Sequence, residues 1–181
     1  ALGGAAVVLD ARSSEVVAMV SLPDFDANDP GDAIADARFS RASLGVYELG
    51  SVFKVFTHAL ALDAGTANLK SGYDATHPLK IGKFTISDFH PERRWLTVPE
   101  IFAVSSNIGA ARMAREVGGE AQKKFLEQLG LLAPTAIELP EVGQPMYPSP
   151  WRDINTATIS FGHGLAVSPV QFAAAVAAVI N

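Results

Sequence analysis

The stretch Tyr47-Glu48-Leu49-Gly50-Ser51-Val52-Phe53-Lys54 places a serine and a lysine three residues apart at a predicted helix start. An α-helix turns by about 100° per residue, so positions i and i+3 lie about 60° apart on one face. Ser51 and Lys54 are therefore predicted to face each other. A serine hydroxyl becomes a good nucleophile when a base removes its proton, and a lysine that burial keeps neutral can be that base. The helix N-terminus adds a favourable field for a developing oxyanion.

The residues around Ser51 and Lys54 decide between an ordinary surface helix and a nucleophile paired with a base. A Ser-x-x-Lys match is expected about once by chance in a chain of this length, so an ordinary surface helix is the competing interpretation. Here apolar residues flank Lys54 on both sides, and the apolar run continues to Leu62 before Gly65 supplies a helix stop signal. Burial among such residues disfavours an ammonium ion and would lower the pKa of Lys54.

A second polar cluster, Val104-Ser105-Ser106-Asn107-Ile108-Gly109, is flanked by apolar residues. Serine and asparagine are common helix N-caps, so this cluster can be read as a structural cap. It can also be read as a hydroxyl and a carboxamide that face a cleft. A short link between two helices can do both.

Taken together, the two clusters carry a family resemblance. Ser51-x-x-Lys54 followed by Ser105-x-Asn107, in this order and at this separation, resembles the penicillin-binding transpeptidases. The third motif of that family is Lys-Thr/Ser-Gly.

The resemblance extends over nearly all of the chain. Residues 47–54 are similar to the active-site entrance of the class B enzymes, although Leu49 and Val52 stand where the family usually has proline and threonine. Residues 151–171, which include Ser160-Phe161-Gly162-His163-Gly164, are similar to the segment before the third motif in division-specific class B enzymes. The chain thus resembles a septal transpeptidase.

This resemblance implies an α+β fold of the penicillin-binding transpeptidase (serine β-lactamase-like) class. We expect a mostly helical body with an N-terminal β-hairpin and an incomplete antiparallel sheet. The family closes its hairpin into a five-stranded sheet with strands that would follow residue 181. The free edge of the hairpin is therefore expected to be exposed or to pair with another chain.

The resemblance also implies a function for each motif residue. Ser51 would be acylated by the penultimate D-alanine of a peptidoglycan stem peptide, with release of the terminal D-alanine and later transfer to the amine of a neighbouring stem. Lys54 would act as general base, Ser105 as proton relay to the leaving amine, and Asn107 as a clamp on the substrate backbone. These roles suit an amine of lowered pKa, a hydroxyl and a carboxamide.

Partners and location follow from the same resemblance. The expected ligands are D-Ala-D-Ala stem peptides and β-lactam antibiotics, with cell-division proteins as partners of the full-length form and no cofactor or metal. The full-length protein is expected at the periplasmic face of the bacterial inner membrane, held by an N-terminal anchor absent here, while this chain is expected to be soluble.

The third motif is the largest departure from the family pattern. The family places it after a position equivalent to Gly164, but the sole textual match, Lys70-Ser71-Gly72, lies between the first two motifs and is predicted to be a solvated loop. Residues 1–181 are thus expected to be a partial transpeptidase domain without the C-terminal strand that supplies part of the oxyanion hole. Removal of one oxyanion donor typically costs about 10²–10³ in rate, so the chain is expected to be impaired or inactive.

Two alternatives stay open. A serine β-lactamase-like hydrolase would need a base that activates water, and Glu138 and Glu141 lie in or beside a proline-rich loop where such a base could stand. A noncatalytic module would use the same surface to bind partners or β-lactams.

Composition excludes several other classes. The 181 residues carry a net charge of −5, which offers no basic stripe for nucleic acid, and they contain no cysteine for disulfides, thiol catalysis or zinc. The longest apolar run, residues 172–180, is far below the ~20 residues of a membrane-spanning helix. The four histidines show no paired metal spacing.

Periodicity, turn residues and capping signals predict the remaining elements. Hairpins are expected over residues 5–20 and 79–86, the second with its turn at Gly82, and a loop over 23–36. Helices are expected over 51–62, 97–104, 108–117 and 120–129 and from 168 onward, with capping boxes at Thr97–Glu100 and Ser168–Gln171.

Overall fold

The computed structural model describes residues 3–31 and 33–181, which form two compact units. The first unit is built from the chain up to residue 47 together with 127–146 and 166–181, and the second from 48–126 and 147–165. Both units are discontinuous in sequence. All four predicted site residues fall in the second unit.

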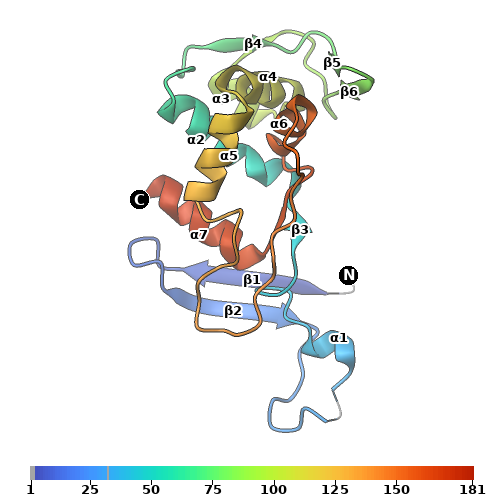
Figure 1. Ribbon diagram of the computed structural model, residues 1–181, viewed down its shortest axis with the longest axis vertical. Helices are drawn as coiled ribbons and strands as arrows, with labels where there is room; N and C mark the ends of the chain where they lie inside the picture. The colour runs from blue at the N-terminus through green and yellow to red at the C-terminus, as the bar shows by residue number, and fades with distance from the viewer. Residues whose placement is uncertain (1–2, 32) are drawn as a thin grey trace. The chain divides into compact units, whose positions relative to one another are not determined.

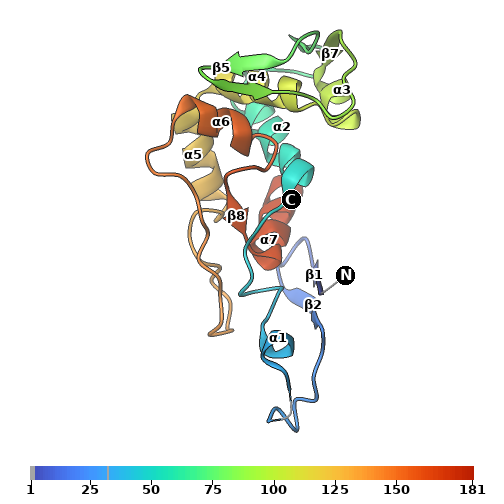
Figure 2. The ribbon, with the colours of Figure 1, turned by 90° about the vertical axis from the view of Figure 1, so that its right-hand side faces the viewer.

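Short strands and helices are interspersed along the chain (Figures 1 and 2). The first unit holds β1 (Gly4–Leu9), β2 (Val16–Leu22), α1 (Ala35–Arg38), β8 (Ala166–Val167) and α7 (Pro169–Ile180). The second holds the 3-10 helix η1 (Gly50–Phe53), α2 (Lys54–Asp63), β4 (Gly72–Asp74), β5 (Leu79–Ile81), β6 (Phe84–Ile86), β7 (Trp95–Thr97), α3 (Val98–Ala103), α4 (Asn107–Val117) and α6 (Asp153–Ile159). β3 (Tyr47–Glu48) and α5 (Gly119–Gln128) lie where the chain passes between units.

The first unit is a hairpin covered by a helix. β1 and β2 pair antiparallel from Gly4 opposite Leu22, and α7 packs against β1 (Figure 1). α7 begins with a capping box in which the Ser168 hydroxyl accepts from the Gln171 backbone N–H. The Gln171 carboxamide also donates to the Ala133 carbonyl at 2.6 Å, which ties the helix to the loop beneath it. The predicted N-terminal hairpin and final helix are thus confirmed.

The hairpin remains short of a full sheet. Each sheet formed by the described residues has two strands, so residues 3–31 and 33–181 do not build five paired strands. Several apolar side chains of β1 and β2 are exposed, among them Val8, Val17 and Leu22. The α+β class is confirmed, and the sheet is incomplete as expected.

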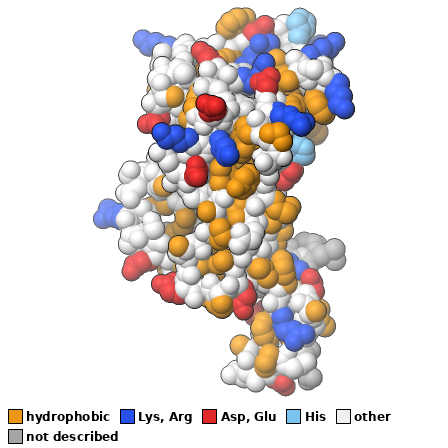
Figure 3. Space-filling view, viewed as in Figure 1, with side chains coloured by type: hydrophobic (Ala, Val, Ile, Leu, Met, Phe, Trp, Pro, Cys, Tyr) orange, Lys and Arg blue, Asp and Glu red, His pale blue; other side chains and the backbone are white. Residues whose placement is uncertain are grey.

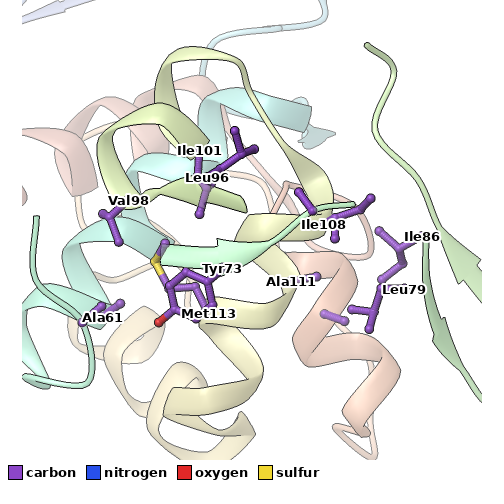
Figure 4. Packing of buried hydrophobic residues seen from close by; sticks show 13 residues of the cluster. Ala61, Tyr73, Leu79, Ile86, Leu96, Val98, Ile101, Ile108, Ala111 and Met113 are labelled. Atoms are coloured by element: carbon purple, nitrogen blue, oxygen red, sulfur yellow. The ribbon is translucent and has the colours of Figure 1, made fainter. Parts of the chain in front are cut away.

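The second unit has a continuous apolar core, seen from close by in Figure 4. It receives side chains from α2, α3, α4 and α6 and from strands β4 to β7. Leu79 and Ile86 face each other across the β5–β6 pair, while Leu96 and Ile101 are fully buried. This core lies directly behind the two predicted motifs, because α2 and α4 both contribute to it.

Local signals define the helices of this unit. Thr97 and Glu100 form the predicted capping box at the start of α3, and Ser106 caps α4. Gly109 on α4 lies so close to Ile101 on α3 that a side chain would not fit between them. The hairpin at 79–86 and the helices predicted over 97–104, 108–117 and 120–129 are confirmed to within one residue, whereas α2 begins at Lys54, three residues after the predicted start at Ser51.

Other elements depart from the sequence prediction. α6 and the β4–β7 pair were not predicted, and α1 starts inside the predicted loop. In the Lys70-Ser71-Gly72 stretch, Lys70 is exposed in a turn as expected, but Gly72 begins β4 and pairs with Thr97. A three-residue strand has little periodicity of its own, and no tight turn joins β4 to β7, where Gly72 pairs with Thr97.

The described helices include none with both the length and the apolar character needed to cross a bilayer. On the face shown in Figure 3, basic and acidic side chains are interspersed over the second unit. That face therefore presents mixed charge.

The core predicts one stability measurement. Leu96→Ala should lower the free energy of unfolding by about 2–5 kcal/mol, because a fully buried leucine leaves a cavity when truncated. Leu69→Ala, the same change at a side chain with 65% exposure, should alter it by less than about 0.5 kcal/mol. Denaturant unfolding of both variants measures the difference, and equal losses would contradict this core.

Candidate active site

The nucleophile candidate lies on a 3-10 turn. Ser51 belongs to η1, which runs directly into α2 at Lys54, so the α-helical start expected from the sequence is replaced by a tighter turn. Residues i and i+3 eclipse each other in a 3-10 helix. The Lys54 amine consequently lies 3.0 Å from the Ser51 hydroxyl oxygen. Ser51 is exposed, whereas Lys54 is only 1% exposed.

The second motif completes the surroundings of the Lys54 amine. Lys54 Nζ lies 2.7 Å from the backbone oxygen of Ser105, 2.8 Å from Ser105 Oγ and 2.8 Å from Asn107 Oδ1. The four residues predicted from the sequence are thus brought together around one nitrogen. In the sequence, Ser105 and Asn107 lie 51 and 53 positions after Lys54.

Burial changes the acidity of this amine. Desolvation lowers the pKa of Lys54 to about 8, against an opposing effect of the Asp88 carboxylate. A neutral amine has two N–H donors and one lone pair. The Ser105 carbonyl and Asn107 Oδ1 can only accept, so they suit the two donors. The lone pair is then left for a hydroxyl, and the Ser51 hydroxyl is within reach.

Different residues of the second motif cap α4 and contact Lys54. Ser106 is the helix cap, since its hydroxyl accepts from the Gly109 N–H at 3.0 Å. Ser105 has a positive φ of 57°, unusual for a residue other than glycine, and both of its oxygens reach Lys54. The Asn107 carboxamide binds Lys54 and donates to the Ser87 carbonyl at 3.1 Å. The capping interpretation is therefore confirmed for Ser106, while Ser105 and Asn107 direct polar atoms to the Lys54 amine.

A third segment, residues 160–164, packs against the start of η1. The Gly50 N–H donates to the Gly162 carbonyl at 3.2 Å, and the Thr57 hydroxyl donates to the Ser160 carbonyl at 2.8 Å. Gly162 has φ +81°, and a Cβ atom there would collide with the Gly50 backbone. Only glycine suits this position, because it combines a left-handed conformation with a close backbone approach.

Glu48 and His163 add a polar contact to this junction. The Glu48 carboxylate lies 2.6 Å from His163 Nδ1 and accepts from the Gly164 N–H at 2.9 Å. Sequence reasoning noted both segments but not this pair, because 115 residues of chain separate them. The available signals in the sequence were that Glu48 lies close to Ser51 and that His163 lies between two glycines, Gly162 and Gly164.

The arrangement suits acyl transfer at an exposed hydroxyl. It offers a nucleophile at Ser51, a buried base at Lys54 and a second hydroxyl at Ser105 that can pass a proton. Within the described part of the chain, no three His, Asp or Glu residues gather as a metal site.

Comparison with known proteins points to one family. Residues 4–181 match the model of the penicillin binding protein transpeptidase domain. The chain is 42% identical over 179 residues to a probable peptidoglycan D,D-transpeptidase FtsI of Caulobacter vibrioides, covering 99% of this chain and 30% of that protein. It is 37% identical over 183 residues to a probable peptidoglycan D,D-transpeptidase PenA of Neisseria gonorrhoeae, covering 100% of this chain and 31% of that protein.

A solved structure has the same fold. The transpeptidase (TP) domain of penicillin-binding protein 3 from Burkholderia pseudomallei superposes with a TM-score of 0.82 at 29% identity, over 97% of this chain and 49% of that one. This chain spans less than a third of the length of the two curated relatives above.

The close approach of Gly162 to Gly50 predicts a larger loss of stability at position 162 than at a glycine in open space. The Cβ atom of Gly82→Ala would meet no atom within 4 Å, so this variant should lower the free energy of unfolding by only about 1–2 kcal/mol, the cost of a left-handed alanine. Gly162→Ala should destabilise the chain by clearly more, because its Cβ also collides with Gly50. Thermal and denaturant unfolding of the two variants provide the comparison. Equal losses would show that the close approach contributes nothing.

Proposed function

The chain belongs to the penicillin-binding protein transpeptidase family, and we propose that it carries the acyl-forming serine of a peptidoglycan D,D-transpeptidase. The observation that carries the proposal is the single buried amine of Lys54 in contact with Ser51, Ser105 and Asn107. Such a base beside an exposed hydroxyl is what nucleophilic acyl transfer requires.

In the first step, Ser51 Oγ attacks the carbonyl carbon of the penultimate D-alanine of a stem peptide. The neutral amine of Lys54 takes the hydroxyl proton as the new C–O bond forms. The C–N bond to the terminal D-alanine then breaks, and the Ser105 hydroxyl passes a proton from Lys54 to the leaving amine. Its oxygen lies 2.8 Å from Lys54 Nζ, close enough for this relay.

In the second step, the amine of a neighbouring stem attacks the Ser51 ester and the same groups act in reverse. We assign Asn107 to the binding of the substrate backbone. Its oxygen faces Lys54, while one N–H of its amide bonds Ser87. The second N–H of that amide is the group that can meet a peptide carbonyl.

The septal role is part of the same proposal. Residues 151–171 resemble division-specific class B enzymes, and the Caulobacter relative carries the name FtsI. The proposed partners are stem peptides, β-lactams and, in the full-length protein, cell-division proteins. The proposed location is the periplasmic face of the inner membrane.

A β-lactamase-like hydrolase is the second candidate function. Glu138 and Glu141, its candidate water-activating bases, are both exposed. The lifetime of a penicillin adduct distinguishes a transpeptidase from a β-lactamase. The presence of an adduct distinguishes both from a noncatalytic module.

The intact mass after incubation with benzylpenicillin tests the proposal. A chain extended through the expected third motif should gain the mass of one penicillin, and Ser51→Ala should gain none, because the acyl bond forms at that hydroxyl. The chain of 181 residues should react at least about 10²-fold more slowly if the third motif supplies an oxyanion donor.

Each other outcome has a definite meaning. An adduct of equal rate on the short chain would refute the need for the third motif. Rapid penicillin turnover in place of a stable adduct would favour a β-lactamase. No adduct on the extended chain would leave a noncatalytic module.

The rate of acylation should depend on pH. The neutral form of Lys54 is the active base, so the rate should rise as pH increases through about 8 and then level off. Lys54→Arg should remove this rise together with most of the activity, because a guanidinium stays protonated. Stopped-flow acylation over about pH 6 to 10 measures it. A rate that falls over this range would exclude Lys54 as the general base.

A further inference from the structure

The second motif has an unfavourable backbone conformation at its first residue. Ser105 lies at φ +57°, in the left-handed region that costs a non-glycine residue free energy. In this conformation both its carbonyl and its hydroxyl oxygen approach Lys54 Nζ, at 2.7 and 2.8 Å. Some contact on the far side of the turn must hold it, since a strained residue persists only where its surroundings determine it.

Asp88, on the loop between β6 and β7, contacts the residues that follow Ser105. Its Oδ2 accepts from the Ser106 hydroxyl at 2.8 Å, and its Oδ1 accepts from the Ile108 N–H at 2.9 Å. Its neighbour Ser87 accepts from the Asn107 amide at 3.1 Å. Two adjacent loop residues thus hold three consecutive residues of the motif.

The bond to Ser106 is hard to replace. Ser106 is 1% exposed, and its hydroxyl already accepts from the Gly109 N–H. Its proton therefore needs a separate acceptor, which Asp88 supplies. A carboxylate at the first turn of α4 is also favoured by the helix dipole.

We propose that Asp88, which lies outside both motifs, is the positioning residue that fixes the strained turn at Ser105 and thereby aims its oxygens at Lys54. The inference rests on the proposed function, because its consequence is faster acylation of Ser51. Asp88 touches none of the reacting atoms, so its effect passes through Ser106 and Ile108.

Asp88 has a second, electrostatic effect on the same lysine. Its negative charge favours the ammonium form and so raises the pKa of Lys54 against the effect of burial. In the described residues, the charged or titratable groups that interact with Lys54 are Asp88 and His58, one turn along α2. The side chains of Ser51, Ser105 and Asn107, which also face the amine, carry no charge.

Two variants separate positioning from charge. Asp88→Asn in the full-length protein should lower the maximal acylation rate with benzylpenicillin by about 10- to 100-fold, the range for a lost hydrogen bond to a charged group. It should also move the midpoint of the pH–rate profile to lower pH, because Lys54 loses a neighbouring negative charge. Ser106→Ala should lower the rate without moving that midpoint, since it removes no charge.

Asp74→Asn is the matched control. Asp74 is another carboxylate of the second unit that accepts from a backbone N–H, that of Thr76, and it should change neither rate nor midpoint. Thermal unfolding of each variant shows that it is folded, and a folded Asp88→Asn with wild-type rate and midpoint would overturn the proposal. If Asp88→Asn does not fold, an unchanged rate in Ser106→Ala would overturn it. A wild-type protein that forms no adduct would refute the proposed function itself.

Discussion

The buried amine of Lys54 is the constraint on which the site depends. A lysine that is 1% exposed must find partners for its N–H groups, because an unpaired polar group in the interior is costly. Its partners come from η1 and from the turn between α3 and α4, so these two segments have to meet. The core residues behind them, including Ile101 and Ile108, set the spacing at which they do so.

Backbone packing at glycine supports the other side of the nucleophile. Gly162 approaches Gly50 at a position where no side chain fits, and Thr57 anchors the same loop through the Ser160 carbonyl. These contacts hold η1 while leaving the Ser51 hydroxyl accessible to solvent. The result is an exposed hydroxyl next to a buried amine, so a ligand can approach the hydroxyl while water has little access to the amine.

Local sequence signals predicted most of the regular structure. The capping boxes at Thr97 and Ser168 located two helix starts, and Gly82 located the turn of the second hairpin. Strands β4 and β7 escaped prediction because no tight turn joins them, whereas the equally short β5 and β6 are joined by the turn at Gly82. The 3-10 turn at Ser51 was missed because residues i and i+3 are neighbours in both an α-helix and a 3-10 helix, so the spacing of Ser51 and Lys54 does not distinguish the two.

The sequence by itself determined the chemical identity of the site. Ser51 and Lys54 lie three residues apart, so any helical turn brings them onto one side, and the family resemblance added Ser105 and Asn107. Only the tertiary structure decided that Asp88 holds the second motif, across 18 residues of chain, and that Gly162 holds η1 through the Gly50 N–H. Such contacts leave no periodic pattern in the sequence, because the packing of the core sets them. The local conformation of neighbouring residues does not.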